Sequence, residues 1–369
     1  MYLGAMKRNA AVIRLLLGGD VMLGRALDQA LEHPGDPRLR EPLIEDARDY
    51  LALAERKSGQ LGLPLGPAEP WGELLPLIDA EDPDHWIINL ETSITYSEDF
   101  CPYKSIHYRM SPANLAVLRA GRVDCCCLAN NHVMDFGQAG LLEPLSSLEQ
   151  QQLAYCGAGR TREAARAPLV LGGGGALRLI NLCFVDSGVS PHSEAGADSC
   201  GVFLLHSMDQ HAVDQVLRAL DGPYDCPTLV SLHWGGNWGY RIPEAQRSFA
   251  HALLDSPAVD LVFGHSSHHP KEIELYRGKA AIYGGGDLIN DYEGIRGHTQ
   301  YRPELALVYI VELERGALRR LEAVPFRRRR LRLERADLEA AEFLRQVLNG
   351  QAAEDAFRTG TNGHLQATL

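Results

Sequence analysis

A group of polar side chains, widely separated along the chain, shares one kind of local surrounding. Each lies at or just after the end of a short apolar run that leads into a turn. The group comprises Asp20, Glu91, Asn131, His132, His233, His265 and His268. Carboxylate oxygens, amide oxygens and neutral imidazoles bind divalent first-row metals such as Mn²⁺, Fe²⁺ and Zn²⁺. Two such ions about 4 Å apart can activate water and hold the attacking and leaving oxygens of a displacement. The residue types therefore predict hydrolytic chemistry with one or two divalent ions.

The apolar runs before these side chains predict buried β-strands. They span Val12–Leu17, Trp86–Ile88, Val123–Leu128, Leu229–Leu232 and Val259–Phe263. Continuous apolar strands of this kind are buried on both faces, as in layered α/β folds. Amphipathic patterns opened by proline predict helices between them, for example over Pro112–Ala120 and Pro243–Leu254. Because ligand sites form beyond the carboxyl ends of such strands, we expect five strands to direct the group toward one edge.

Each member of the group also has a simpler explanation when taken alone. Asp20 could cap the following helix, and Asn131 could occupy a left-handed turn. His233 and His265 could be ordinary core or loop histidines. The repetition of the same placement after five strands favours a shared site over these separate explanations.

Composition limits the classes of protein that the chain can belong to. Of its 369 residues, 45% are hydrophobic and 23% are charged, which is typical of a globular protein and excludes a disordered chain, a collagen-like fibre and a coiled coil. The length allows one large domain or two. The chain carries 36 Lys and Arg against 48 Asp and Glu, a net charge of −12, which argues against binding nucleic acid.

The sequence predicts no membrane span, because no run of about 20 apolar residues occurs. The apolar stretch Ala10–Leu17 contains Arg14 and runs into Gly18, Gly19 and Asp20 instead of a cleavage site, so we interpret it as a strand. Eight cysteines without metal-finger spacing are consistent with buried, reduced thiols. These features predict a cytoplasmic protein.

Three local patterns give further expectations about the chain beyond residue 168. The segment Leu169–Leu182 predicts a hairpin that turns at Gly172–Gly175. The segment Leu305–Leu313 predicts an edge strand, and we expect the residues from about Thr359 onward to be frayed.

The stretches that contain the polar group resemble the successive motifs of the CapA family, the poly-γ-glutamate capsule-synthesis proteins related to calcineurin-like metallophosphoesterases. These stretches are Gly19–Arg25, Asn89–Thr92, Ala129–Gly137, Leu232–Gly235 and Gly264–His268. Gly157–Arg160 and the stretch from Glu272 to Asp287 are also similar to this family. The order and spacing match over about residues 12–313, which is most of the chain.

The resemblance implies an α/β fold, a four-layer αββα metallophosphoesterase-like sandwich with the metal site at the strand ends. It implies one metal bound by Asp20 and His268, a bridging Glu91, and a second metal bound by Asn131, His233 and His265. It also implies that His132 protonates a leaving group or holds a substrate oxygen and that Asp135 orients it. Arg25 would neutralise an anionic group of the substrate.

The sequence departs from the related phosphatases at two motifs. Their usual Asp-x-His is Asp20-Val21-Met22 here, so the first metal loses a ligand. The closing motif contains two serines followed by two histidines, so either His268 or His269 is the returning ligand. Asp287 and Asn290 are weaker candidates, because the family more often has Gly-Asn-Phe there.

We predict a CapA-like domain over residues 10–325 with an insertion at 34–72, followed by a charged helical extension at 326–369. The predicted function is a metal-dependent hydrolase that acts on a phosphoester or a γ-glutamyl-type amide of a small or polymeric anionic substrate. Two alternatives stay open: an accessory protein without catalysis that binds an anionic polymer or a synthase, and a cytoplasmic tailoring enzyme for a small molecule. A homo-oligomer also stays open.

Overall fold

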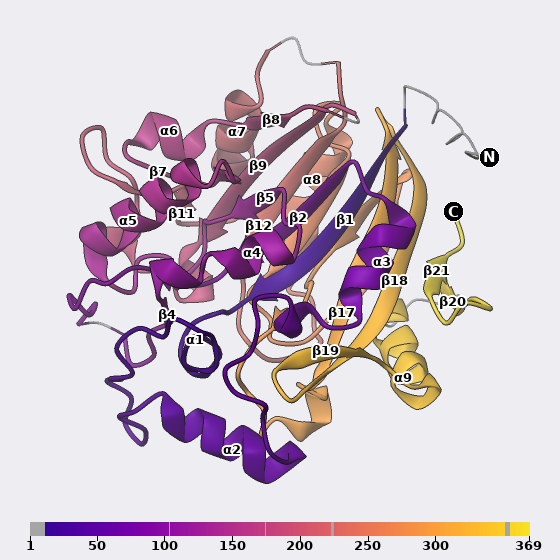
Figure 1. Cartoon of the computed structure of the whole chain (residues 1–369). Coiled ribbons are helices and arrows are strands. Elements are labelled where there is room, and N and C mark those ends of the chain that lie inside the picture. Colours follow the sequence, from indigo (N-terminus) through magenta and orange to yellow (C-terminus); the bar gives the residue numbers. More distant parts are fainter. Residues whose placement is uncertain (1–11, 103, 174, 223–224, 351–354) are drawn as a thin grey trace, which may run out of the picture.

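Two large β-sheets lie face to face, and helices cover the outer side of each sheet (Figure 1). The computed structural model describes residues 12–102, 104–173, 175–222, 225–350 and 355–369. Residues 10 and 11, the expected start of the domain, lie outside these ranges. Within the ranges, none of the helices is both long enough and apolar enough to cross a bilayer.

The first sheet is built around the long strand β1 (Val12–Val21). Parallel strands continue from one side of β1 in the order β2 (His85–Leu90), β5 (Cys125–Cys127) and β6 (Ala154–Cys156). Antiparallel strands continue from its other side in the order β17 (Leu305–Glu314), β18 (Ala317–Arg329), β21 (Leu365–Ala367) and β20 (Phe357–Thr359). The short strand β16 (Asp287–Ile289) pairs with the carboxyl end of β1, and β19 (Arg332–Arg335) pairs with β18.

The second sheet has a mainly parallel centre. Its strands follow the order β11 (Leu204–Leu205), β9 (Leu177–Phe184), β12 (Thr228–His233), β13 (Leu261–His265), β15 (Lys279–Ile282) and β14 (Ile273–Tyr276), with β8 (Leu169–Leu171) paired to β9. Two small pairs lie apart from both sheets: β3 (Ser93–Ile94) with β4 (Arg109–Met110), and β7 (Ala158–Gly159) with β10 (Gly201–Val202).

Helices form the two outer layers. The helices packed on the first sheet are α1 (Ala26–Ala30), α2 (Arg48–Ser58), α3 (Leu74–Glu81), α4 (Ala116–Ala120) and α5 (Gly137–Gln150). Helices α7 (Gln210–Ala219) and α8 (Glu244–Asp255) pack on the second sheet. Helix α6 (Arg162–Arg166) lies beside β7, and α9 (Leu338–Asn349) contributes to the apolar layer between the sheets.

Successive side chains of each strand point to opposite faces of its sheet, and they form three apolar layers between the four layers of helices and sheets. In β1, Leu16 packs under the helices of the first sheet, whereas Leu15 and Leu17 point into the space between the sheets. In β12, Leu229 fills the same inter-sheet space, whereas Val230 packs under α7 and α8. A strand buried on both faces must be apolar at every position, which explains the continuous runs in the sequence. The predicted four-layer αββα sandwich is confirmed.

Most of the predicted elements are present with shifted bounds. The strands predicted at the start of the chain and before His233 become β1 and β12, and the predicted hairpin becomes β8 and β9. The helix predicted over Pro112–Ala120 is divided into a 3₁₀ turn, Pro112–Asn114, and the short helix α4.

Two expectations about the C-terminal part were wrong. The strand β17 is not an edge strand, because it pairs with β1 on one side and with β18 on the other. The end of the chain is not frayed: β21 pairs with β18 through Ala323 and Leu365, and Leu365 is buried between the sheets.

The expected insertion, residues 34–72, contains α2 and packs on the outer face of the first sheet. The expected boundary between residues 325 and 326 falls inside β18. Beyond it the chain supplies β19, α9, β20 and β21. The division into 10–325 and 326–369 stays a prediction.

Candidate metal centre

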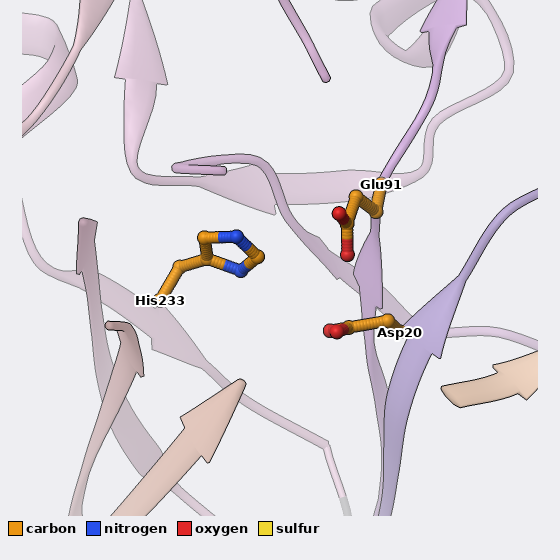
Figure 2. Close-up of side chains that lie close together, drawn as sticks. All are labelled: Asp20, Glu91 and His233. Atoms are coloured by element: carbon orange, nitrogen blue, oxygen red, sulfur yellow. The ribbon is translucent and has the colours of Figure 1, made fainter. Parts of the chain in front are cut away.

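Three buried side chains from both sheets meet at the carboxyl ends of their strands. Asp20 lies near the end of β1, Glu91 directly follows β2, and His233 ends β12. One ligand atom of each lies within 4.8 Å of the others. Figure 2 shows the two carboxylates side by side, with the His233 ring facing them from the opposite sheet. The carboxyl ends of parallel strands are where α/β sheets place ligand sites, as expected from the sequence.

Backbone and side-chain donors hold the Asp20 carboxylate in place. Asn89 Nδ2 donates to Asp20 Oδ1 at 2.7 Å, and the Ser266 amide donates to Oδ2 at 3.1 Å. Ser266 has a φ of 90°, a conformation that residues other than glycine seldom adopt, and this turn directs its N–H toward Asp20. Gly19 permits the close approach of β1 to the chain before β16, since a Cβ there would lie 1.8 Å from the Gly286 carbonyl oxygen.

The electrostatic surroundings of Asp20 favour its ionised form. Burial alone would raise the pKa of Asp20. The adjacent His265 and His233 rings and the hydrogen bond from Asn89 outweigh burial and lower this pKa below its usual value. Asp20 therefore presents a negative charge to the site at neutral pH.

The Glu91 carboxylate lacks hydrogen-bond donors of the kind that hold Asp20. It is 1% exposed, and its Oε2 atom accepts no hydrogen bond. Burial, followed by the neighbouring carboxylates of Asp20 and Asp287, raises the pKa of Glu91 well above its usual value. A buried carboxylate oxygen without a donor beside a second carboxylate is the environment that a bound cation would satisfy. The donor set of two carboxylates and an imidazole fits a divalent metal ion.

Two further predicted ligands lie next to these three residues. Asn131 Oδ1 lies 3.0 Å from His233 Nε2. His265 Nδ1 lies 3.3 Å from Asp20 Oδ1 but makes no hydrogen bond, while its Nε2 atom lies 3.0 Å from Ser231 Oγ. Burial lowers the pKa of His233 to about 3, so this ring is neutral and able to act as a ligand. The structure thus brings Asp20, Glu91, Asn131, His233 and His265 together.

The remaining two candidates differ in what their ring nitrogens contact. His268 Nδ1 lies 3.0 Å from Asp287 Oδ1, and its Nε2 lies 3.0 Å from Asn237 Nδ2. Burial lowers the pKa of His268, but Asp287 raises it more, so this pKa lies above its usual value. Both nitrogens of His269 bind backbone instead: Nε2 accepts from the Gly239 amide and Nδ1 lies 2.9 Å from the Pro270 carbonyl oxygen. Between the two rings, only His268 contacts side chains of the site.

His132 and Asp135 form a close pair beside Glu91. His132 Nδ1 lies 2.6 Å from Asp135 Oδ2, and His132 Nε2 lies 3.8 Å from Glu91 Oε1. The Lys104 ammonium contacts the other oxygen of Asp135 and lies 3.2 Å from His132 Nδ1. Burial is the main reason that the pKa of His132 is lowered, to about 4. The neutral ring then carries its proton on Nδ1 toward Asp135, which leaves Nε2 as a proton acceptor.

Arg25 has only internal partners. Its Nε donates to Asp291 Oδ2 at 3.0 Å, and its Nη1 pairs with Glu41 Oε1 at 2.9 Å. The guanidinium also stacks on the rings of Tyr50 and Tyr108, with its central carbon 4.2 and 4.3 Å from their centroids. A buried arginine that is neutralised by two carboxylates gives no support to the predicted contact with an anionic substrate.

Sequence reasoning did not identify several residues that shape this centre. Asn89 was visible as the polar residue directly after the apolar run Trp86–Ile88, and it lies opposite Asp20 in the sheet register. Asn130 precedes the predicted ligand and accepts hydrogen bonds from the His132 and Val133 amides. Lys104 gave no signal, because it lies alone in an irregular polar segment.

Comparisons with known proteins agree with the motifs. The family model described as "Bacterial capsule synthesis protein PGA_cap" matches residues 14–292. A probable polyglutamine synthesis accessory protein of Mycobacterium tuberculosis (strain ATCC 25618 / H37Rv) is 43% identical over 351 residues, which cover 93% of this chain and 92% of that protein. The PGA biosynthesis protein CapA of Bacillus subtilis (strain 168) is 26% identical over 311 residues, 83% of this chain and 69% of that protein. The chain, as its CapA-like motifs indicated, belongs to the bacterial capsule synthesis protein family PGA_cap.

Proposed function

We propose that this protein is a metal-dependent hydrolase with a metallophosphoesterase-like site and that it acts in poly-γ-glutamate (capsule) biosynthesis. The observation that supports this most is the unpartnered Glu91 Oε2 atom in a buried cluster with Asp20 and His233. The names of the relatives from M. tuberculosis and B. subtilis support the biosynthetic context.

One or two divalent ions of Mn, Fe or Zn would be held by Asp20, Glu91, His233, Asn131 and His265. His268 stays a proposed ligand at the margin of this cluster. A bound ion of this kind supplies Lewis acidity that polarises a phosphoryl or carbonyl oxygen. This chemistry serves a phosphoester and a γ-glutamyl-type amide equally, so both substrates remain in the proposal.

The protein itself supplies orientation and proton transfer. Asn89 and the Ser266 amide fix the Asp20 carboxylate. His132 Nε2 accepts a proton from the attacking water and returns it to the leaving group, while its Nδ1–H stays bound to Asp135. Burial opposes ionisation of Asp135, but His132 and Lys104 lower its pKa, which keeps this carboxylate charged behind the imidazole.

The second candidate function is an accessory protein that binds an anionic polymer or a synthase without catalysis. The 43% identical relative is named an accessory protein. Met22, which stands at the position of the phosphatase histidine, is fully buried and supplies no nitrogen ligand. A third candidate, a cytoplasmic tailoring enzyme, is supported by the eight free thiols, which are usual in a reducing compartment.

Metal analysis combined with an activity assay separates these functions. The protein is purified without chelator, its metal content is measured by plasma mass spectrometry, and hydrolysis is followed on bis(p-nitrophenyl) phosphate and on a γ-glutamyl p-nitroanilide. We expect bound metal and hydrolysis of one of these compounds that EDTA abolishes and excess Mn²⁺ or Zn²⁺ restores. Absence of both metal and hydrolysis would favour the accessory function.

A further inference from the structure

A cavity of about 570 Å³ lies beside Asn290 and Tyr292, next to the candidate metal centre. Its walls are the C-terminal end of α2, the irregular segment 290–304 and the hairpin of β18 and β19. Figure 1 shows α2 and β19 on the same side of the molecule. The volume falls in the range of about 300–1,000 Å³ that is usual for ligand pockets.

The lining of this cavity is basic although the chain as a whole is acidic. Five Lys and Arg residues and three Glu residues line it. Among these charges, Glu304 pairs with Arg302 and Arg327 pairs with Asp337, while Glu293 keeps its charge and accepts from Ser58 and the Leu331 amide. By contrast, Lys57 and Arg329 are exposed and form no ion pair with another described residue. The local field therefore favours an anion.

Arg328 adds a buried cation to the cavity wall. It is 7% exposed, and its two terminal nitrogens donate only to backbone carbonyl oxygens, those of Asp287 and Leu288 and those of Pro303 and Leu305. Its Nε atom has no hydrogen-bond partner, and no described carboxylate forms an ion pair with it. Burial lowers the pKa of Arg328, and the nearby carboxylates of Asp287, Glu304 and Glu293 offset only part of this effect, so an anion in the cavity would stabilise the guanidinium further.

Two residues of the cavity wall also contact the margin of the metal centre. Tyr292 lines the cavity, and its hydroxyl lies 3.5 Å from His268 Nε2. Asn290 also lines it and donates to Asp287 Oδ2 at 2.6 Å, which is the carboxylate that His268 contacts. A ligand that fills the cavity therefore contacts Tyr292 and Asn290, which in turn contact His268 and Asp287.

We propose that this cavity binds carboxylates of an acidic, γ-glutamyl-type chain whose reacting bond lies at the metal centre. Lys57, Arg328 and Arg329 are the specificity-determining cations, and the hairpin that carries two of them lies beyond residue 292, where the family match ends. The inference deepens the proposed function by naming the substrate class, but binding in the cavity requires neither metal nor hydrolysis.

The test is binding of γ-linked tetraglutamate to the full chain in EDTA, measured by isothermal titration calorimetry. The double variant Lys57→Gln/Arg329→Gln removes two exposed charges from the cavity. The matched variant Arg218→Gln/Arg358→Gln removes two charges from α7 and β20, away from it. Arg328 is left unchanged, because its backbone hydrogen bonds stabilise the surrounding segment. We expect the cavity variant to bind about 10- to 100-fold more weakly and the matched variant to bind within about twofold of the wild type.

Three results would overturn the proposal: no binding by the wild type, equal weakening in both double variants, or binding of tripolyphosphate in the cavity in preference to tetraglutamate. The outcome is separable from that of the hydrolase proposal. Metal-free binding that depends on Lys57 and Arg329 supports the cavity even if no hydrolysis occurs. Conversely, metal-dependent hydrolysis without tetraglutamate binding supports the hydrolase and rejects the cavity.

Discussion

Asp20 and Glu91 extend from neighbouring parallel strands so that their carboxylates lie side by side in a buried site. Two buried carboxylates in one site repel each other unless they share a proton or a cation. Asn89 and the Ser266 amide stabilise Asp20 as an anion. The repulsion between the two carboxylates therefore disfavours the ionised form of Glu91 more than that of Asp20. The raised pKa of Glu91 expresses this imbalance, which a divalent cation would remove.

We expect Glu91→Gln to stabilise the metal-free protein at neutral pH. The amide keeps the size of the side chain, removes the repulsion and can donate to Asp20, which we expect to raise the free energy of unfolding by about 1–3 kcal/mol. Because the pKa of Glu91 is higher in the folded than in the unfolded state, the folded wild type binds more protons above the ordinary value of 4.5 and loses stability as pH rises. The advantage of the variant should therefore grow with pH.

Thermal unfolding in EDTA over a pH series measures this effect, and the same scan in excess MnCl₂ measures the gain from metal. The gain should be present in the wild type and absent in Glu91→Gln. The exposed Glu45→Gln is the control and should change the unfolding free energy by less than about 0.5 kcal/mol. A Glu91→Gln protein that is less stable than the wild type at every pH in EDTA would contradict the prediction.

Removing either predicted imidazole ligand should lower metal content. His233→Ala and His265→Ala each delete a nitrogen beside Asp20, and we expect substoichiometric Mn or Zn in both variants by plasma mass spectrometry. His211→Ala removes an exposed histidine on α7 and should keep the wild-type metal content. Wild-type stoichiometry in both site variants would exclude these two ligands.

His132 is expected to move a proton and not to hold the metal. We predict that His132→Ala lowers turnover by about 10²–10⁴-fold, the usual contribution of general acid–base catalysis, while metal content stays unchanged. Asp135→Asn should lower turnover as well, because Asp135 fixes the proton on His132 Nδ1. The measurement is steady-state hydrolysis with parallel metal analysis, and unchanged turnover in His132→Ala would remove this residue from the mechanism.

Arg25 is expected to stabilise the fold. Arg25→Gln leaves the buried Asp291 and Glu41 without their cation, and breaking a buried pair in this way costs about 3–5 kcal/mol. Urea denaturation measures the loss. Arg38→Gln breaks an exposed pair with Glu98 and should cost less than about 1 kcal/mol. If Arg25→Gln kept full stability and raised only KM, the expectation that Arg25 neutralises an anionic group of the substrate would be correct.

The sequence predicted those features that depend on residues close together along the chain, such as strands and the turns that end them. Runs such as Leu229–Leu232 are apolar at every position because both faces of the strand are covered, and turn residues mark where each run ends. The position of Asp20, Glu91 and His233 at those ends followed from the same runs. The shared edge was therefore predictable from these runs, whereas the four-layer sandwich was implied by the resemblance of the motifs to the CapA family.

Other features depend on contacts between residues far apart in sequence. Arg25 and Asp291 are 266 residues apart, so no local pattern reveals that the arginine is already neutralised. The two adjacent histidines have similar sequence surroundings, and only the backbone contacts of His269 distinguish it from His268. The edge strand expected at Leu305–Leu313 became interior because β18 pairs with it.

Amino-acid sequence alone thus determined the strands and the side chains at the strand ends, because burial and turn formation act over a few residues, and the resemblance of its motifs to a known family added the layers. Tertiary structure decided which of those side chains meet, which are satisfied internally and where the basic cavity forms. These outcomes depend on the packing of one sheet against the other, which the order of residues along a single strand does not encode.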